Sequence, residues 1–304
     1  MLNLHTTEAY VDIHTLRYFL TVCQEGTMSR AAEVLHITQP TLSRQISNLE
    51  RELGSQLLIR HSRHVEPTEK GKYLLRRAVE IVDLADKTRA DFAADGSIVE
   101  GDISIAAGET YGMKFVAHAV STFQAEYPQV RFHIHSADAS VATHRLDSGI
   151  ADFAVLLGYP SVSDYDYIRL RATDAWGVYM LADDPLVAKE AVSLEDLAGK
   201  PLISSERADK MGVMASWFGE YAGQVNVVAT YNLVRSAEYL LREHMGYLIA
   251  LDQLVPAGGG TGIEFRPIYP PAVVNVDVCW KRGAKQSHAV DLFRRHLIAL
   301  NDFK

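Results

Sequence analysis

The periodicity of the apolar residues changes once along the chain, and this change constrains the fold more than any other feature. Up to about residue 97 the pattern is helical with short breaks, whereas from residue 103 short apolar strands alternate with helices. Such alternation predicts a parallel sheet joined by right-handed crossovers. We therefore predict an α+β protein in which a helical N-terminal region precedes a larger α/β region. Strands are expected at 103–107, 130–135, 153–157, 176–181, 201–204, 225–230, 247–250 and 273–280, and helices at 110–127, 141–148, 233–243 and 288–300.

Composition narrows the class of protein. A chain of 304 residues predicts about two domains. Its 48% apolar and 22% charged residues are ordinary for a soluble globular protein. No apolar run approaches the ~20 residues that cross a membrane, and the first residues lack the basic start and apolar core of a secretory signal. Cys23 and Cys279 form no redox or metal motif. We therefore expect a cytoplasmic protein without membrane contact.

The segment 29–54 contains two short amphipathic helices separated by a turn. In the second helix Leu42, Ile46 and Leu49 form one apolar stripe. Thr38 can cap this helix, and Pro40 is tolerated in its first turn. This layout is typical of a helix-turn-helix, whose second helix enters the major groove of DNA. The alternative is an amphipathic helical hairpin with a solvated polar face.

The polar side chains of the second helix suit base recognition. Gln pairs with adenine, Arg with guanine, and Ser or Thr with either. The segment 56–68 follows and is expected to form a two-stranded wing along the DNA backbone, while the start of the preceding helix is placed for phosphates. The predicted DNA-binding residues are Ser29, Arg30, Gln39, Pro40, Thr41, Ser43, Arg44, Arg60 and Arg63.

The distribution of charge qualifies this prediction. Residues 1–97 hold 12 Lys and Arg against 13 Asp and Glu, a net charge of −1 within a total of −8. Within 36–64, four arginines and three histidines face only Glu50 and Glu52. This local patch is less basic than a domain that would be assigned to DNA on charge alone.

A long helix is expected from Thr68 to about residue 94. Its apolar and small residues recur with the spacing of a heptad repeat, which is typical of a coiled coil. An ordinary helix packed on its own domain has the same periodicity, and both alternatives stay open. The stripe consists of Leu74, Ala78, Ile81, Ala85, Thr88 and Phe92.

The N-terminal region resembles the DNA-binding domain of LysR-type transcriptional regulators. The matching residues are Leu16, Phe19, Gly26, Ala31, Ala32, Leu35, Thr38, Gln39, Pro40, Ser43, Ile46, Leu49, Glu50, Leu53, Gly54, Leu57, Arg60, Thr68 and Gly71. The order of elements that follows also resembles this family. Leu58 departs from the family, which often has Phe there.

The resemblance implies a fold and a domain organisation. It implies a winged helix-turn-helix at 1–71, a dimerising linker helix at 72–97 and a periplasmic-binding-protein-like effector domain at 98–304. This last domain would have two lobes, 98–171 with 272–304 and 172–271. It also implies double-stranded operator DNA as partner, a homodimer or homotetramer, and a small-molecule effector that is often a small carboxylate or an aromatic acid.

The effector is expected at the carboxyl ends of the strands, where open α/β folds bind ligands. Free backbone donors at a helix start favour an anion there, although Glu109 at the first such helix would repel one. Each of these positions can equally be a polar loop at a strand end. The predicted effector-binding residues are Thr110, Tyr111, Ser204, Ser205 and Asn232.

The alternative function is a solute receptor or a transferase with the same two-lobed fold. That class needs neither the polar helix at 39–52 nor the heptad helix, and such a receptor would carry a secretion signal. No nucleophile elbow, kinase, phosphate-loop or zinc pattern occurs. We therefore predict a DNA-binding regulator rather than an enzyme, with no catalytic residues, cofactor or metal.

Overall fold

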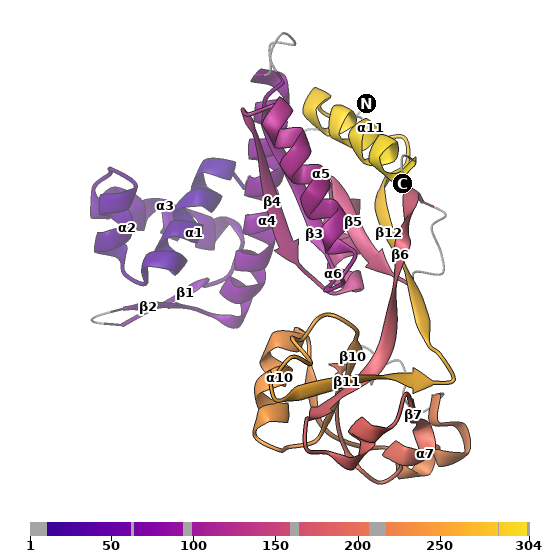
Figure 1. Cartoon of the computed structure of the whole chain (residues 1–304). Coiled ribbons are helices and arrows are strands. Elements are labelled where there is room, and N and C mark those ends of the chain that lie inside the picture. Colours follow the sequence, from indigo (N-terminus) through magenta and orange to yellow (C-terminus); the bar gives the residue numbers. More distant parts are fainter. Residues whose placement is uncertain are drawn as a thin grey trace. The chain divides into compact units, whose positions relative to one another are not determined.

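The structure is a computed structural model, and it divides into two compact units, 1–93 and 94–304. We call them the N-terminal unit and the C-terminal unit and describe each by itself (Figure 1). The described residues are 11–61, 64–93, 99–158, 164–206, 217–284 and 286–302. No helix in these ranges has a stretch long and apolar enough to cross a bilayer.

The N-terminal unit is a winged helix-turn-helix, as predicted. Phe19, Leu42, Ile46 and Leu49 are all 0% exposed in its core, so the predicted apolar stripe is the buried face of the second helix of the motif. The two wing strands pair antiparallel. Its elements are α1 (Ile13–Glu25), α2 (Met28–Val34), α3 (Gln39–Glu52), β1 (Leu58–Arg60), β2 (Val65–Pro67) and α4 (Glu69–Ala93).

The wing is joined tightly to the long helix α4. The Thr68 hydroxyl accepts a hydrogen bond from the Gly71 amide at 3.0 Å and donates one to the Gln56 carbonyl at 2.8 Å. A Cβ atom on Gly71 would lie 2.0 Å from the Leu57 carbonyl oxygen. Only glycine therefore fits at position 71, and the predicted N-cap at Thr68 is confirmed.

Helix α4 buries only the first part of the predicted heptad stripe. Leu74 and the buried Ala78 and Val82 pack against Leu16 of α1. Ile81 is 43% exposed, and the neighbouring Leu84 is 42% exposed. The first part of the stripe therefore packs within its own unit, whereas the part around Ile81 remains open. The side chain of Phe92 lies outside the described part of the helix.

The C-terminal unit contains a mixed sheet with two lobes. Strands β4, β3 and β5 pair in this order in the first lobe and β10, β8 and β9 in the second, and both groups are parallel, as predicted. Two antiparallel strands join the groups: β12 pairs with β5 and with β6, and β6 pairs with β10. The first lobe contains β3 (Gly101–Ala107), α5 (Met113–Glu126), β4 (Val130–Ser136), α6 (Ala139–Asp147), β5 (Phe153–Leu157), most of β12 (Val273–Lys281) and α11 (His288–Asp302). The second lobe contains β7 (Val192–Ser193), α7 (Leu194–Leu197), β8 (Pro201–Ser205), β9 (Asn226–Tyr231), α10 (Val234–Arg242), β10 (Tyr247–Leu251) and β11 (Ile263–Tyr269), with 3-10 turns at Pro185–Ala188 and Gly219–Gln224.

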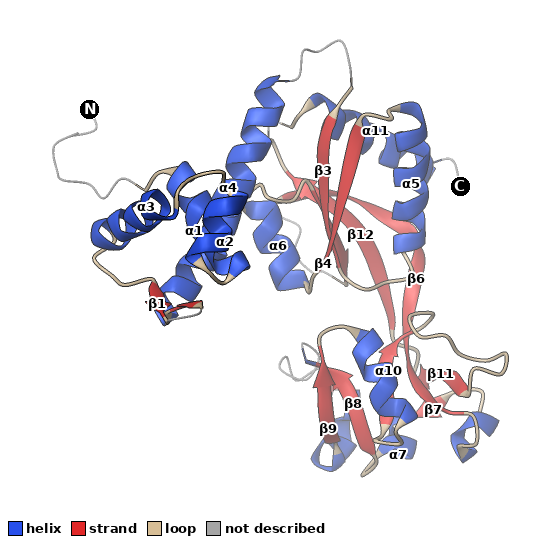
Figure 2. Ribbon diagram, turned by 90° about the vertical axis from the view of Figure 1, so that its left-hand side faces the viewer, coloured by secondary structure: helices blue, strands red, loops and turns tan. Residues whose placement is uncertain are grey.

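Helices cover both faces of the first lobe's sheet (Figure 2). On one face α5 and α11 pack together around Phe123 and Phe293, whose ring centroids lie 5.2 Å apart. On the other face α6 packs Ala142 and Leu146 against Ala106. Because α11 follows every other described element of this lobe in the sequence, the core of the first lobe is completed only by residues 288–302.

One long strand, β6 (Tyr165–Leu181), runs from the first lobe into the second (Figure 1). Its first half pairs with β12 as far as Ala175, and from Trp176 it pairs with β10. The prediction of a strand at 176–181 covers only the last third of β6. The prediction also omitted β11, which begins just after a glycine-rich segment at 258–262 and contains Pro267.

Candidate functional site

The polar face of α3 is open to solvent at its N-terminal end. Gln39, Pro40, Thr41 and Arg44 are exposed, and Ser43 is partly exposed. Thr38 occupies the N-cap position, but its hydroxyl lies 2.8 Å from the Thr41 hydroxyl instead of bonding to a backbone amide. The predicted base-reading residues therefore lie together on the first turns of one helix, opposite the buried stripe.

Arg60 on the wing is hydrogen-bonded to α3. Its guanidinium donates to the Ser43 hydroxyl at 2.9 Å and to the Ser47 hydroxyl at 3.1 Å. The Glu50 carboxylate lies 3.7 Å from the same group. Arg60 was predicted to follow the DNA backbone along the wing, and in the structure it also fixes two hydroxyls of the helix face.

The remaining predicted DNA contacts lie on α2 and the wing. Ser29 and Arg30 are exposed on the first turn of α2, and the Arg30 guanidinium lies 3.4 Å from the Glu25 carboxylate. Thr27 caps this helix by accepting a hydrogen bond from the Arg30 amide. Arg63 lies outside the described residues.

Glu50 connects α3 to the start of the wing. One oxygen of its carboxylate accepts hydrogen bonds from the Leu57 and Leu58 amides, at 2.9 and 3.1 Å. These leucines are 2% and 0% exposed, so water does not readily replace the carboxylate as their partner. The wing therefore depends on a side chain that sequence patterns identified only as part of the family resemblance.

Three potential metal ligands lie close together on the wing. The ligand atoms of His61, His64 and Glu66 lie within 4.8 Å of one another. The two imidazole rings stack, however, with centroids 4.3 Å apart and planes at 16°. Because an imidazole binds a metal in the plane of its ring, two stacked rings do not direct their nitrogens at one ion.

The thiol of Cys279 is buried, and that of Cys23 is partly buried. Burial raises the pKa of Cys23 to about 11 and the pKa of Cys279 to about 12. The reactive form of cysteine is the thiolate. Both thiols therefore remain protonated and unreactive at neutral pH.

A cavity of about 320 Å³ lies in the C-terminal unit and is lined by both lobes. The first lobe contributes the turn at Gly108 and Glu109 and the start of α6 at Asp138. The second lobe contributes Trp176 and Trp217, whose ring centroids lie 5.2 Å apart. The cavity is mostly apolar with a few polar groups, which is typical of a small-molecule site.

The predicted effector contacts differ in their relation to this cavity. Ser205 and Asn232 line it. Ser204 does not; it is 0% exposed, and its hydroxyl has no hydrogen-bond partner among the described residues. Successive side chains of a strand point to opposite faces of the sheet, which is why adjacent serines have different surroundings.

Thr110 and Tyr111 lie in a turn before α5 rather than in its first turn. The helix was expected from residue 110 but begins at Met113, because the Thr110 hydroxyl accepts from the Gly112 amide at 2.9 Å and forms a tight turn. The Tyr111 amide donates to the Asp174 carboxylate at 3.2 Å. Neither residue is among those that line the cavity.

Asp174 is a buried carboxylate on β6, where that strand passes between the lobes. It is 0% exposed. Burial raises its pKa above the ordinary value, the nearby charge of Asp252 acts in the same direction, and hydrogen bonds from Thr110 and Tyr111 act against both. The turn at Thr110 therefore contacts the strand that connects the two lobes.

Glu109 joins the two lobes across the cavity. Its carboxylate accepts a hydrogen bond of 2.6 Å from the amide of Val234, the first residue of α10. Burial raises the pKa of Glu109, while this hydrogen bond acts to lower it. The sequence analysis placed Glu109 at the start of the helix that follows it in the first lobe. In the structure the Glu109 carboxylate instead accepts a hydrogen bond from the start of α10, a helix of the second lobe.

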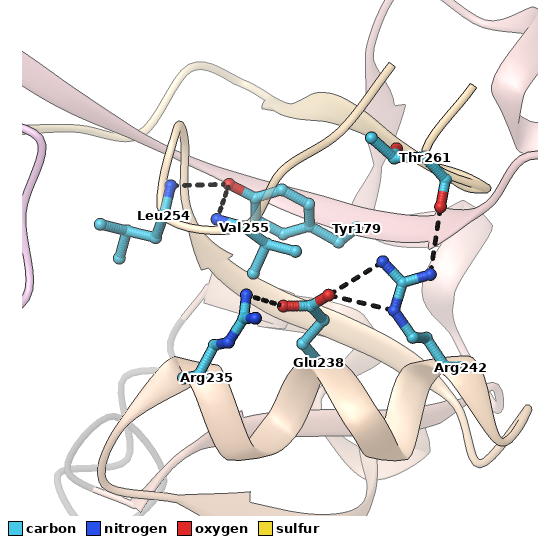
Figure 3. A network of polar contacts seen from close by, with 7 residues as sticks. All are labelled: Tyr179, Arg235, Glu238, Arg242, Leu254, Val255 and Thr261. Atoms are coloured by element: carbon cyan, nitrogen blue, oxygen red, sulfur yellow. Dashed lines mark hydrogen bonds and ion pairs between the residues drawn. The ribbon is translucent and has the colours of Figure 1, made fainter. Parts of the chain in front are cut away.

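A polar network fixes α10 and the loop beside it (Figure 3). The buried Glu238 carboxylate accepts hydrogen bonds from Arg235 at 2.7 Å and Arg242 at 2.9 Å. Arg242 also donates to the Thr261 carbonyl at 3.1 Å. The Tyr179 hydroxyl accepts from the Leu254 amide at 3.2 Å, and Leu254 lines the cavity. The loop at Leu254 is therefore held by the Tyr179 hydroxyl and α10 by the ion pairs of Glu238, and neither Tyr179 nor Glu238 lines the cavity.

Comparison with known proteins matches both units. Residues 13–72 match the family described as "Bacterial regulatory helix-turn-helix protein, lysR family", and residues 97–301 match "LysR substrate binding domain". The chain is 25% identical over 285 residues to an uncharacterized HTH-type transcriptional regulator, YybE, of Bacillus subtilis; the match covers 93% of this chain and 97% of YybE. It is 32% identical over 154 residues to the nitrogen assimilation regulatory protein nac of Escherichia coli, a match that covers half of each chain.

Solved structures agree with this fold. Full-length CbnR complexed with its target DNA has a TM-score of 0.71 and 20% identity, and the match covers 95% of this chain and 100% of CbnR. Full-length BenM has a TM-score of 0.53 and 22% identity, and the match covers 96% of each chain. At these identities the likeness shows the fold alone.

The fold and the family matches define a class of protein, the DNA-binding regulators that combine a winged helix-turn-helix with a two-lobed effector domain. The chain belongs to the LysR family of bacterial transcriptional regulators. It is a DNA-binding transcriptional regulator with a C-terminal domain for a small-molecule effector, and the predicted family and fold class are confirmed.

Proposed function

We propose that this regulator reads its operator with the exposed first turns of α3 and is controlled by an effector in the cavity of the C-terminal unit. In this proposal residues 1–71 bind DNA, residues 72–97 link two copies, and residues 98–304 bind the effector. The protein acts in the cytoplasm, and it needs neither catalysis nor a cofactor. The observation that carries it is the division of α3 into a fully buried stripe and an exposed polar face.

Within the DNA-binding face we assign different roles to two arginines. Arg44 is exposed on α3 and reads a base, since Arg is the commonest partner of guanine. Arg60 is hydrogen-bonded to Ser43 and Ser47 and positions the helix face while it contacts the DNA backbone. Gln39, Thr41 and Ser43 complete the base-reading set beside Pro40, and Ser29, Arg30 and Arg63 contact phosphates.

The experiment is a selection of DNA fragments by the purified protein, followed by affinity measurements on the selected site and on random DNA. Arg44→Ala should weaken binding to the selected site by about 1–3 kcal/mol and relax the preference at one base pair. Arg76→Ala removes the same charge from an exposed position on α4 and serves as the matched control. Equal losses by Arg44→Ala on both DNAs would contradict base reading.

For the effector we propose direct contacts with Ser205 and Asn232, which line the cavity. Ser204 lies behind this wall, and Thr110 and Tyr111 connect the cavity turn to Asp174, so we assign these three residues to positioning. A small carboxylate, as expected from the family resemblance, is one candidate for the effector.

We also propose that α4 forms the contact between two copies, as a homodimer or as the pairs of a homotetramer. Ile81 and Leu84 lie one turn apart on α4, are exposed, and are not among the residues that pack on Leu16 of α1. Exposed large apolar side chains on one helix face support such a contact.

A further inference from the structure

Two histidines lie at the end of the wing, where β1 leads into β2. The His61 amide donates to the His64 carbonyl at 2.9 Å, and the two rings stack with their centroids 4.3 Å apart. The Glu66 carboxylate lies 2.8 Å from Nε2 of His64 and 3.9 Å from Nε2 of His61. The histidine side chains are 44% and 50% exposed, so an anionic group of a partner can reach both imidazoles.

The strand pairing places these histidines on the face of the wing opposite to Arg60. Arg60 lies opposite Val65 in the ladder, and its guanidinium bonds to α3. The bond between His61 and His64 continues this ladder by one pair. Successive side chains of a strand point to opposite faces, which agrees with the contact of both histidines to Glu66, one residue after Val65. The end of the wing therefore carries basic groups on both of its faces.

The other charged groups on the elements around the wing have partners of their own. Among the described residues, Glu66 is the only ion-pair partner of the two histidines. Arg63 lies outside the described residues, and because an arginine keeps its charge at all pH values considered below, it does not contribute to a change with pH. The surrounding pairs are Arg60 with Glu50 at 3.7 Å, Arg30 with Glu25 at 3.4 Å, Lys72 with Glu69 at 2.6 Å, and Lys70 with the Ser55 hydroxyl at 2.8 Å.

The charge of such a pair of imidazoles depends on what lies beside it. Histidine is the side chain whose charge ordinarily changes between about pH 5 and 8. Two imidazoles in contact repel each other when both are protonated, and a nearby anion favours the protonated form. The ion pair with Glu66 is exposed and therefore weak, so a phosphate can replace the carboxylate. The end of the wing thus binds protons more readily beside a phosphate than in free protein.

On the premise that the wing contacts the DNA backbone, as proposed above, we infer that His61 and His64 are phosphate-binding residues that act in their protonated form. Protonation of the pair and DNA binding then favour each other, because the coupling between two ligands is reciprocal. DNA affinity is highest below the pH range in which the free histidines titrate. It falls as the pH rises through the range in which they titrate in the complex. The regulator therefore holds DNA more tightly in acidic surroundings.

The test uses the full-length protein and two DNAs, the fragment selected by the purified protein and a random duplex of the same length. Fluorescence anisotropy gives both affinities over a series of NaCl concentrations near pH 6 and near pH 8, about the two sides of the histidine titration. We expect binding about five- to tenfold tighter near pH 6, as when one proton is held about ten times more tightly in the complex. The random duplex should share this change, because phosphate contacts carry no sequence information.

The salt dependence separates a phosphate contact from an indirect effect of pH. Each cation that neutralises a phosphate makes the slope of log affinity against log salt steeper by about 0.9. The slope should therefore be steeper near pH 6 than near pH 8 by about 1 to 2, for one or two imidazolium contacts.

Three variants assign the effect to the wing. The double variant His61→Gln with His64→Gln has no imidazole at the end of the wing and should lose most of the difference between the two pH values, in affinity and in salt slope. His64→Lys keeps a positive charge at both pH values and should bind both DNAs more tightly than wild type near pH 8. His144→Gln is the matched control, because it removes an exposed imidazole from α6 of the C-terminal unit and should keep the wild-type difference.

The inference is overturned if the double variant keeps the wild-type dependence on pH and salt while circular dichroism shows it to be folded. If the double variant is unfolded, His64→Lys decides, since an affinity near pH 8 no higher than that of wild type overturns the inference. A wild-type protein that prefers no DNA sequence overturns the proposed function. Sequence-specific binding that does not change between the two pH values overturns only the role of the histidines.

Discussion

Replacement of Glu50 by alanine should destabilise the N-terminal unit without changing the C-terminal unit. In the native state one Glu50 oxygen accepts hydrogen bonds from the Leu57 and Leu58 amides, and the Glu50 side chain is only 17% exposed. Alanine leaves both amides without a partner in a region where the two leucines are buried.

The magnitude follows from these two hydrogen bonds. A hydrogen bond to a charged group contributes about 1.5–3 kcal/mol. The two bonds share one oxygen, so their contributions do not add fully, and the contact to Arg60 at 3.7 Å adds little because it is partly exposed. We expect a loss of about 3 kcal/mol in the free energy of unfolding for Glu50→Ala. Glu50→Gln keeps an acceptor and should lose about 1 kcal/mol.

The chain contains its own reference for this measurement. All three tryptophans, at 176, 217 and 280, belong to the C-terminal unit. Urea unfolding followed by tryptophan fluorescence therefore reports that unit alone, whereas far-ultraviolet circular dichroism reports both. In Glu50→Ala the component seen only by circular dichroism should move to lower urea, and the fluorescence transition should not move.

Glu52→Ala is the matched control, since Glu52 is exposed on the same helix two residues away. It should change the free energy of unfolding by less than about 0.5 kcal/mol. The reasoning is refuted if Glu50→Ala behaves like Glu52→Ala, or if the two spectroscopic transitions of Glu50→Ala move together.

Three further predictions concern other parts of the chain. Ile81→Glu places a charge on the open face of α4 and should convert the oligomer to a smaller species in light scattering, whereas a species of unchanged mass would show that this face is not the contact. Burial raises the folded pKa of Asp174. The favourable contribution of Asp174 to stability is therefore present below the ordinary value of 3.8 and is lost as the pH rises through the folded pKa. Fluorescence-detected unfolding should show wild type losing stability relative to Asp174→Asn over that pH interval, and a constant difference would contradict this. His36 has a φ of 54° directly after the C-cap of α2, so His36→Gly should raise the stability of the N-terminal unit by about 0.5–1 kcal/mol in circular dichroism, and a decrease would show that its side chain contributes more than the strain costs.

The sequence was most informative where one face of an element is buried and the other is solvated. Helix α3 shows this, because Leu42, Ile46 and Leu49 mark its buried face with the helical period. The strand β5 was predicted with its observed bounds because it is a continuous apolar run.

The sequence was less informative where charged residues interrupt a strand. The first half of β6 contains Asp166, Arg169 and Arg171, so it does not show a strand pattern, although Arg169 forms an ion pair with the buried Asp277 at 2.9 Å. That partner is far away in the sequence. Local periodicity cannot reveal a strand whose charges are compensated by a distant residue.

The candidate effector site was predicted in part for a similar reason. A cavity was expected at the carboxyl ends of the strands and is found there, and Ser205 and Asn232 line it. The contact between Glu109 and Val234 joins two lobes, and Trp217 lies outside every predicted strand and helix. Contacts of this kind depend on how the lobes pack, which a pattern along one chain does not contain.

The position of α11 has a consequence for the timing of synthesis. The N-terminal unit is complete at residue 93, but the first lobe lacks β12 and Phe293 of α11 until the residues up to 302 have been added. At 5–20 residues per second, about 10–40 s separate these two points on the ribosome. During each round of translation, the part of the molecule that recognises DNA is therefore finished well before the part that can respond to a signal.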